Sequence, residues 1–372
     1  MAFNPQQLLC RNAILDRGGH ITFHWLKVAE AERDMVLPLM MRLANMEELQ
    51  ADYILPAQWI QDEILLGKIS KKVVLVVPDD PAAVAVADKA RALGYRTAHI
   101  YGDNSEEARP TQFELVPFGQ HGMRASASAI VTGIETPEEY RQTLADNAAY
   151  CSGKLAMLPT PTASSRRINP SHALILELMS AVQQEMDTPH IEGLLKRDVT
   201  LSFKLLRYIN SPGFGLFARV ESVRHALSII GYQQLLKWLA LLAITASNEA
   251  SPALTQAAII RARFMELIGA RKLEKSDADN LFVTGMLSLL DRMTGVPLAN
   301  ILPYANLPPA ISEALLQEDG RYLRFLRLAQ ACEGSAALDE ADADIFSDMD
   351  LKAVNFSHLE ALEWSAGIIR NA

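Results

Sequence analysis

The sequence predicts an α/β half followed by an all-α half. Over residues 1–160, short β-branched runs alternate with helix signals, a pattern typical of sheets whose strands are joined by helices. From residue 171 to about residue 333 the helical period dominates and strand signals almost vanish. The 372 residues, 49% of them hydrophobic, exceed what one ordinary core requires. We therefore expect two domains, each with its own core.

The first half is expected to open with a β-hairpin, because residues 13–15 and 21–26 flank a glycine-rich turn at residues 17–20. Residues 73–77 form a β-branched run, typical of a strand covered on both faces. Further strands are expected at residues 96–101, 113–118, 127–132 and 154–158.

Helix signals lie between these strands. Pro81 is placed to start a helix and Gly94 to end it. Thr136, Pro137 and Glu139 form a capping box with proline at the first helical position. With about eight strands in such units, the expected fold is a largely parallel sheet, either open or closed into a barrel.

The second half is predicted as one helical domain over residues 171–372, after a linker at residues 161–170. Leu174, Leu178 and Val182 mark one face of its first helix. Ser222 is expected to cap the start of a later helix, and Gly231 to end it. Further helices are expected at residues 235–246, 253–273, 278–294 and 308–316.

Two segments of this half have unusual composition. The apolar run at residues 235–246 contains Lys237 and is too short to span a bilayer core of about 30 Å, so a buried helix is expected. Residues 333–350 hold seven acidic residues and no Lys or Arg, which favours a solvated loop. Residues 351–370 are expected to close the chain as one more helix.

Charge and cysteine content exclude several classes of function. A net charge of −9 argues against a general affinity for nucleic acid or anionic membranes. Cys10, Cys151 and Cys332 are isolated, which suits a reducing cytoplasm and excludes a disulfide framework and a cysteine-built zinc site. The first residues lack the pattern of a signal peptide. A cytoplasmic protein without a membrane span is expected.

Three blocks in the second half occur in order at suitable spacing. They are Leu-Leu-Arg-Tyr-Ile-Asn-Ser-Pro at residues 205–212, Ser-Val-Arg-His-Ala-Leu-Ser-Ile-Ile-Gly at residues 222–231, and Lys-Trp-Leu at residues 237–239. With them, residues 168–246 resemble the HDOD domain, a non-catalytic relative of the HD phosphohydrolases. The resemblance implies an HD-like helical fold that binds proteins, with candidate interaction residues at Arg207, Asn210, Ser211, His225, Gly231 and Trp238.

Three of these candidates also have structural interpretations. The helical spacing of Trp238 with Leu239 and Leu242 is more typical of a core than of a partner groove. Asn210 and Ser211 are expected to make local side-chain to backbone hydrogen bonds that shape the turn.

The first half is similar to a degenerate EAL domain, the barrel that hydrolyses cyclic di-GMP. The similarity rests on Cys-Arg-Asn-Ala-Ile-Leu-Asp-Arg at residues 10–17 and Thr-Gly-Ile-Glu-Thr at residues 132–136. It implies an EAL-type (β/α) barrel over residues 1–160, in front of the HDOD domain. Because the half is shorter than a full EAL barrel, its helices are expected to be short or missing.

The EAL resemblance also predicts that the catalytic groups are lost. Only Glu135 keeps its family identity, as a vestigial position. One carboxylate does not hold two divalent cations, and the nearest acids, Asp103 and Glu114, lie off the motifs. Traced residue by residue, the other catalytic and ligand positions fall on His24, near Leu55, on Val76, on Ile100 and Tyr101, near Val116 and Pro117, and on Ser152.

No metal site is expected in the helical half either. HD phosphohydrolases need an adjacent His-Asp pair, and the chain contains no such dipeptide. His172, His190, His225 and His358 are far apart in sequence, and a cap or surface role is expected for each.

The prediction is a non-enzymatic bacterial signal-transduction regulator or scaffold whose HDOD domain binds other signalling proteins. Its barrel is expected to serve as a scaffold or as the platform of a homodimer. We expect no cofactor, no metal, no catalytic residue and no binding of cyclic di-GMP. Alternatives are a cyclic-dinucleotide phosphodiesterase with ligands around His24, Glu135 and Asp103, a sensor that binds a nucleotide without cleaving it, and an HD-type metal-dependent phosphohydrolase.

Overall fold

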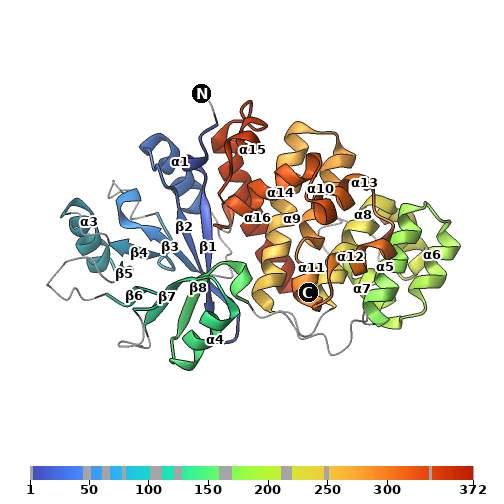
Figure 1. Cartoon of the computed structure of the whole chain (residues 1–372), viewed down its shortest axis with the longest axis horizontal. Helices are drawn as coiled ribbons and strands as arrows, with labels where there is room; N and C mark the ends of the chain where they lie inside the picture. Colours follow the sequence, from blue (N-terminus) through green and yellow to red (C-terminus); the bar gives the residue numbers. More distant parts are fainter. Residues whose placement is uncertain are drawn as a thin grey trace. The chain divides into compact units, whose positions relative to one another are not determined.

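The chain divides into two compact units (Figure 1). The barrel unit comprises Met1–Pro159, Ser251–Ile260 and Arg327–Ala372, and the helical unit comprises Thr160–Ala250 and Arg261–Leu326. The structure is a computed structural model that describes residues 3–44, 52–60, 68–77, 81–100, 111–120, 128–158, 170–210, 220–246, 251–334 and 337–371. The predicted linker at residues 161–170 falls almost wholly outside these ranges.

Eight strands form a closed barrel in sequential order, which decides between the open and closed sheets that the sequence allowed. The first strand is antiparallel to both of its neighbours, and all other neighbours are parallel. The predicted hairpin is confirmed as the first two strands. The strands are β1 (Cys10–Asp16), β2 (Ile21–Lys27), β3 (Asp52–Pro56), β4 (Val74–Val77), β5 (Arg96–Ile100), β6 (Phe113–Pro117), β7 (Ala129–Ile134) and β8 (Tyr150–Gly153).

The last strand lies earlier than predicted. The sequence favoured residues 154–158, but these hold a 3₁₀ turn, η4 (Leu155–Met157). Strand β8 ends where Gly153 meets β7: a Cβ there would lie 1.9 Å from the carbonyl oxygen of Ile134. Only glycine permits this close backbone approach, and the N–H of Lys154 then donates to the same oxygen at 2.9 Å.

One barrel helix, α4, starts at the signal that the sequence predicted. In α4 (Pro137–Ala145), the Thr136 hydroxyl accepts from the Glu139 N–H at 3.2 Å, and a Glu139 carboxylate oxygen accepts from the Thr136 N–H at 3.1 Å. The predicted capping box is thereby confirmed. The other helical elements around the barrel are η1 (Pro5–Gln7), α1 (Arg33–Ala44), η2 (Ala57–Trp59) and α3 (Pro81–Ala92).

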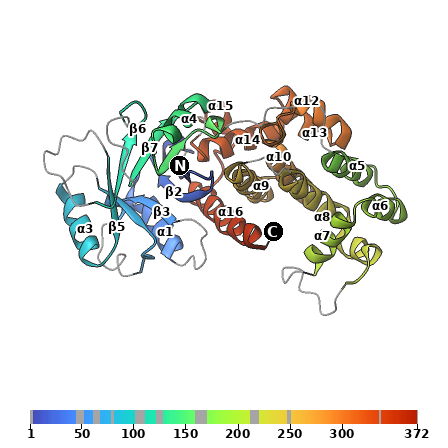
Figure 2. The ribbon, with the colours of Figure 1, turned by 90° about the horizontal axis from the view of Figure 1, so that it is seen from below.

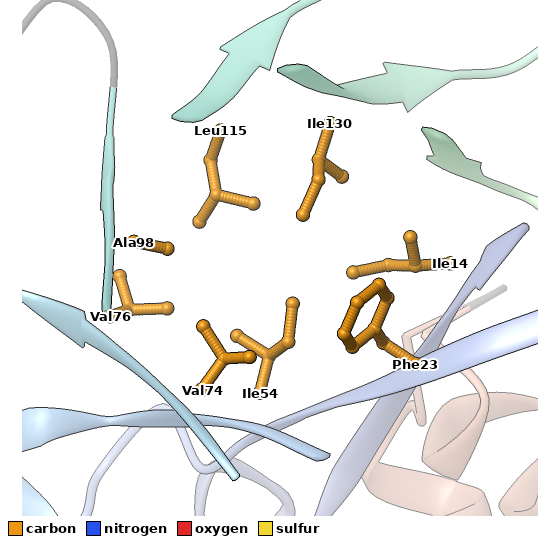
Figure 3. Close-up of a cluster of buried hydrophobic side chains, with 8 residues drawn as sticks. All are labelled: Ile14, Phe23, Ile54, Val74, Val76, Ala98, Leu115 and Ile130. Carbon is orange, nitrogen blue, oxygen red and sulfur yellow. The ribbon is translucent and has the colours of Figure 1, made fainter. Parts of the chain in front are cut away.

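A cluster of eight buried apolar side chains fills the interior of the barrel. Four partly buried side chains pack against it: Trp25, Ile100, Phe113 and Tyr150. Because successive side chains on a strand point to opposite faces, these positions fix which residues of each strand face inward. Figure 3 shows the cluster itself, which consists of Ile14, Phe23, Ile54, Val74, Val76, Ala98, Leu115 and Ile130.

The last helix, α16 (Leu351–Asn371), belongs to the barrel unit and not to the helical domain in which the sequence placed it. Asn355 accepts from the N–H of Leu9 at 2.8 Å and donates to the carbonyl of Gln7 at 3.0 Å. Nδ1 of His358 lies 3.0 Å from the carbonyl oxygen of Leu9. These buried bonds to the segment that precedes β1 explain why the C-terminal residues group with the barrel.

The acidic segment at residues 333–350 is not simply a solvated loop. It contains a short helix, α15 (Glu340–Asp344), capped by the side chain of Asp339. Asp342 is buried and accepts from Arg327 at 3.0 Å, and Glu333 is also buried. A buried carboxylate requires such a partner, and the arginine that supplies it for Asp342 lies outside the segment.

The helical unit is built from helices throughout its described residues (Figure 2). The helix predicted at residues 278–294 is two helices, and the one predicted at residues 308–316 continues as a π-helical turn, η7 (Glu313–Gln317). Helices α9 and α14 are divided between the two units. The helical elements are α5 (Pro170–Gln183), α6 (Thr188–Leu195), α7 (Val199–Ile209), α8 (Val223–Thr245), α9 (Pro252–Lys272), α10 (Lys275–Leu287), α11 (Leu290–Thr294), α12 (Leu298–Ile301), η6 (Leu302–Ala305), α13 (Pro309–Ser312) and α14 (Arg321–Cys332).

Helix α8 is long and apolar enough to cross a membrane by length and composition alone. Most of its apolar stretch is buried inside the protein, as in the core helix of a globular domain. Gly231, with φ of 69° and ψ of 164°, interrupts the helix as the sequence predicted. Ser222 caps its start by accepting from the N–H of His225 at 3.2 Å, again as predicted.

Candidate functional sites

The carboxyl ends of the parallel strands β2–β8 define one end of the barrel, which we call the barrel mouth. In (β/α) barrels, catalytic side chains are found at this end. Among the traced catalytic positions, Val76 lies within the buried interior cluster and Ile100 packs against it. Ser152 is buried, and its hydroxyl donates to the carbonyl of Ala13 at 2.8 Å. These described positions offer hydrocarbon and one engaged hydroxyl.

Three other traced positions face away from the interior. His24 lies between the inward residues Phe23 and Trp25, so it points to the outer surface of the sheet. By the same alternation Leu55, next to Ile54, and Val116, next to Leu115, point outward, and both are buried. A side chain on the outer surface cannot serve a site at the barrel mouth.

His24 is a buried, neutral imidazole. Its ring centroid lies 5.9 Å from that of Tyr53, and Nδ1 has no hydrogen-bond partner within the described residues. Burial, and then the charges of Arg11 and His358, hold the pKa of His24 well below its usual range. The surroundings are therefore those of a protein interior, not those of a metal ligand facing solvent.

Glu135, which the sequence matched to a motif of EAL domains, follows β7 at the barrel mouth. Its carboxylate pairs with the ammonium group of Lys154, which follows the neighbouring strand β8, at an N–O distance of 2.8 Å. Both side chains are exposed, so the pair itself adds little stability. Nevertheless, a divalent cation at Glu135 would have to compete with this ammonium group.

A second ammonium group lies at the same end, because Lys27 terminates β2. Its Nζ lies 3.2 Å from the centroid of the Trp25 ring. Burial lowers the pKa of Lys27 to about 8, despite the opposing influence of Cys10. Positive side chains thus lie where the hydrolysis of a phosphodiester with two metal ions requires carboxylates.

The structure separates two members of the ligand set expected for an unusual phosphodiesterase. His24 points outward from β2, whereas Glu135 lies at the barrel mouth after β7. Glu114 alternates with the inward residue Leu115, so it also points outward, and it pairs with His99 at 3.3 Å. Asp103 lies outside the described residues. Over the described ranges, the structure contains no group of three or more His, Cys, Asp or Glu side chains placed to hold a metal ion.

In the helical unit, Asn210 joins the two ends of the segment at residues 211–219. Its Nδ2 donates to the carbonyls of Leu206 at 2.7 Å and Val220 at 2.8 Å, and its Oδ1 accepts from the Val220 N–H at 2.8 Å. The side chain therefore makes side-chain to backbone hydrogen bonds, as its residue type predicted, and links Val220 to the end of α7. Ser211 lies outside the described residues.

The remaining candidate interaction residues fall into two groups. Trp238 is buried and stacks on Tyr208, with ring centroids 6.2 Å apart and 28° between the planes. It is therefore a core residue, as its spacing with Leu239 and Leu242 indicated, and cannot contact a partner directly. Arg207, His225 and Gly231 are exposed.

Two histidines predicted at caps or on the surface are instead buried. Nε2 of His172 lies 2.9 Å from the carbonyl oxygen of Ala243, and burial lowers the pKa of His172. Burial and the charge of Arg11 lower the pKa of His358 to about 3. Each ring binds a backbone carbonyl that is distant in sequence, which local sequence signals do not reveal. His190 is exposed, as expected.

The sequence analysis missed a buried charge cluster in the helical unit. The ammonium group of Lys237 on α8 donates to Asp279 on α10 at 2.8 Å and to Glu266 on α9. Arg263 donates to the other oxygen of Glu266 at 2.8 Å. The one available signal was a lysine inside an apolar run. These ion pairs link α8, α9 and α10. Each charge in the cluster has an opposite charge beside it, as charges removed from water require.

Across residues 169–305 the chain matches the HDOD domain family. The chain therefore carries an HDOD domain there, and this part of the predicted resemblance is confirmed.

Two curated proteins are similar to the chain. The uncharacterized protein YuxH of Bacillus subtilis is 23% identical over 236 residues, which are 62% of this chain and 57% of that protein. The cyclic di-GMP phosphodiesterase CdgJ of Vibrio cholerae is 26% identical over 239 residues, which are 64% of this chain and 55% of that protein. The chain thus spans about half the length of the curated relatives it matches.

One solved structure, from Shewanella amazonensis and provisionally assigned as a metal-dependent phosphohydrolase, is 14% identical to the chain. The likeness covers 62% of this chain and 97% of that chain, with a TM-score of 0.33. At that TM-score the likeness does not establish a shared fold.

Proposed function

We propose that this chain, with its HDOD domain at residues 169–305, is a non-enzymatic signalling protein. In this proposal the barrel is a degenerate EAL domain that serves as a scaffold, and the HDOD domain binds other signalling proteins. The closed eight-stranded barrel and the similarity to a protein named as a cyclic di-GMP phosphodiesterase support the EAL origin.

The observation that carries the proposal is the character of the barrel mouth. Hydrolysis of a phosphodiester with two metal ions needs several oxygen ligands, because Mg²⁺ prefers an octahedral shell of oxygens. The traced positions hold Val76 and Ile100 in the interior, and His24 on the outer surface. Glu135 is paired with Lys154. These residues do not fit a pair of divalent cations, so we derive no catalytic step through them.

The proposal is tested by incubating the full chain with cyclic di-GMP and either Mg²⁺ or Mn²⁺, and separating the products by chromatography. An active EAL phosphodiesterase in the same buffer is the positive control. We expect no linear dinucleotide above the protein-free blank. Linear product that increases with the amount of chain and disappears with a chelator would overturn the non-enzymatic assignment.

Two further measurements address the alternatives. Calorimetric titration with cyclic di-GMP tests a sensor that binds without turnover, and we expect no heat of binding. Elemental analysis of the purified chain tests a metal-dependent phosphohydrolase in the helical unit. Stoichiometric bound iron or manganese would favour that enzyme over the proposed binding domain.

A further inference from the structure

A groove in the helical unit lies among α5, α6 and the η6 turn, within the HDOD domain. It has a volume of about 400 Å³. One face of helix α5 lines the groove with Ala173, Glu177 and Ala181. These residues share a face because they are four positions apart. The remaining lining residues are Ser180, Gln184, Met186, His190, Leu194 and Tyr304.

The groove combines a buried apolar base with exposed apolar side chains at its edge. Ala181 and Leu194 are buried. By contrast, Tyr304 is 63% exposed and Met186 is 36% exposed. Tyrosine is enriched among the residues that dominate binding energy at protein interfaces, and methionine adapts to varied apolar partners. An occupant would remove both side chains from water.

The volume of the groove suits one anchoring side chain. It lies at the lower end of the range of about 300–1,000 Å³ for small-molecule sites, so the charges beside the groove, and not its size, point to a basic peptide. The hydroxyl of Tyr232 donates to the Met186 carbonyl at 2.8 Å, which holds the edge of the groove in place before any partner binds.

The segment that carries α5 and α6 is acidic, and Glu177 is its carboxylate that lines the groove. Residues 170–195 contain four carboxylates and no Lys or Arg. Glu177 pairs with Arg197, and Glu192 pairs with Lys196 and Arg224. The other two acids, Glu185 and Asp187, flank Met186, are exposed, and have no ion-pair partner in the described part of the chain.

We propose that this groove binds a short basic segment of a partner protein, which inserts one large apolar side chain between Met186 and Tyr304 while its Lys or Arg residues face Glu185 and Asp187. This inference rests on the proposed function, because it assigns a surface and a partner chemistry to the HDOD domain. Opposite charges across an interface favour the encounter and set the register, and the inserted side chain provides most of the affinity.

The probe is a phage-displayed library of random 12-residue peptides, selected on the full chain and counter-selected on the Tyr304→Ala variant. We expect the enriched peptides to be basic and to share a large apolar residue. Dissociation constants of representative labelled peptides are then measured by fluorescence anisotropy. Acidic or uncharged enriched sequences, or no enrichment over the counter-selection, would overturn the proposal.

Matched variants separate binding in the groove from general stickiness. Tyr304→Ala should weaken binding at least about tenfold. Phe203→Ala removes another exposed aromatic ring of the helical unit, on α7 and outside the groove, and should leave binding unchanged. Glu185→Gln and Asp187→Asn should each weaken binding about two- to fivefold, and the asparagine preserves the cap of α6. Equal losses for Phe203→Ala and Tyr304→Ala would refute the assignment.

Other outcomes distinguish this inference from the proposed function. If sedimentation shows a dimer that Tyr304→Ala converts to a monomer, a second copy occupies the groove and the basic-partner proposal fails. If the full chain binds a signalling protein equally well with and without Tyr304→Ala, the HDOD domain is still a binding domain but the groove is not its site. If groove-specific peptides are found and the chain hydrolyses cyclic di-GMP, the groove stands and the non-enzymatic function fails.

Discussion

Lowering the pH from 7 to 5.5 should weaken the barrel unit through the buried histidines His24 and His358. Both side chains are almost completely excluded from water. Burial lowers the pKa of His358 to about 3 and holds that of His24 well below its usual range. In the unfolded chain both should titrate near the ordinary histidine value of about 6.5.

The sign of the effect follows from proton linkage. For a histidine whose pKa is lower in the folded state, the unfolded chain binds more protons below pH 6.5, so stability falls as the pH falls. At pH 5.5, one unit below the unfolded value, the buried His358 costs about 1.4 kcal/mol, and His24 acts in the same direction. The loss for His358 should continue to grow until the pH approaches 3.

The matched variant is His358→Asn. The asparagine Nδ2 can take the place of the imidazole Nδ1–H, which donates to the carbonyl oxygen of Leu9 at 3.0 Å, but it does not titrate. Urea unfolding is followed by tryptophan fluorescence, since Trp25, Trp59 and Trp364 belong to the barrel unit and only Trp238 belongs to the helical unit. The free energy of unfolding is measured at both pH values for both proteins.

Between pH 7 and 5.5 the natural protein should lose about 1.4 kcal/mol more than His358→Asn. Other titrating groups cancel in this comparison because both proteins contain them. His190→Asn, at an exposed position, should retain the full pH dependence. Equal losses in the natural protein and His358→Asn would mean that His358 accepts a proton in the folded state, and the burial argument would be wrong.

Two substitutions test the packing of the helical unit. Lys237→Met should destabilise it by about 3 kcal/mol, because it leaves the buried carboxylate of Asp279 without its cation and leaves Glu266 with Arg263 alone; a thermal midpoint equal to that of the natural protein would show that the cluster is solvated. Gly285→Ala should cost about 1–3 kcal/mol by overpacking, since its Cβ would lie 2.6 Å from the Cα of Ala262. Its control is Gly193→Ala, where a Cβ meets nothing within 4 Å; the reasoning fails if the two alanine variants melt alike.

Local chemistry allowed parts of the barrel to be predicted. The turn at residues 17–20 and the capping box at Thr136 act through neighbours in sequence, and both formed as expected. The end of β8 was missed because it depends on the approach of Gly153 to Ile134 on another strand. The closing role of α16 was missed for the same reason, since Asn355 and Leu9 lie at opposite ends of the sequence.

In the candidate sites, too, features set by neighbours in sequence could be predicted, and features set by distant contacts could not. Tracing motifs located Glu135, but it could not reveal the pairing with Lys154 or the outward direction of His24, because both depend on strand register and alternation. The helical spacing of Trp238 with Leu239 and Leu242 indicated its role in the core. The groove edged by Tyr304 joins three elements separated in sequence, so no local pattern identifies it.

The hydrogen bonds from α16 to the segment before β1 determine when the barrel can complete its fold during synthesis. During synthesis β1 is made before the HDOD domain, whereas Asn355 and His358 are added only after it. Until then the backbone groups of Gln7 and Leu9 lack these native partners. We therefore expect the nascent barrel to remain accessible to chaperones and proteases until α16 docks, and a chain truncated before residue 351 to remain so.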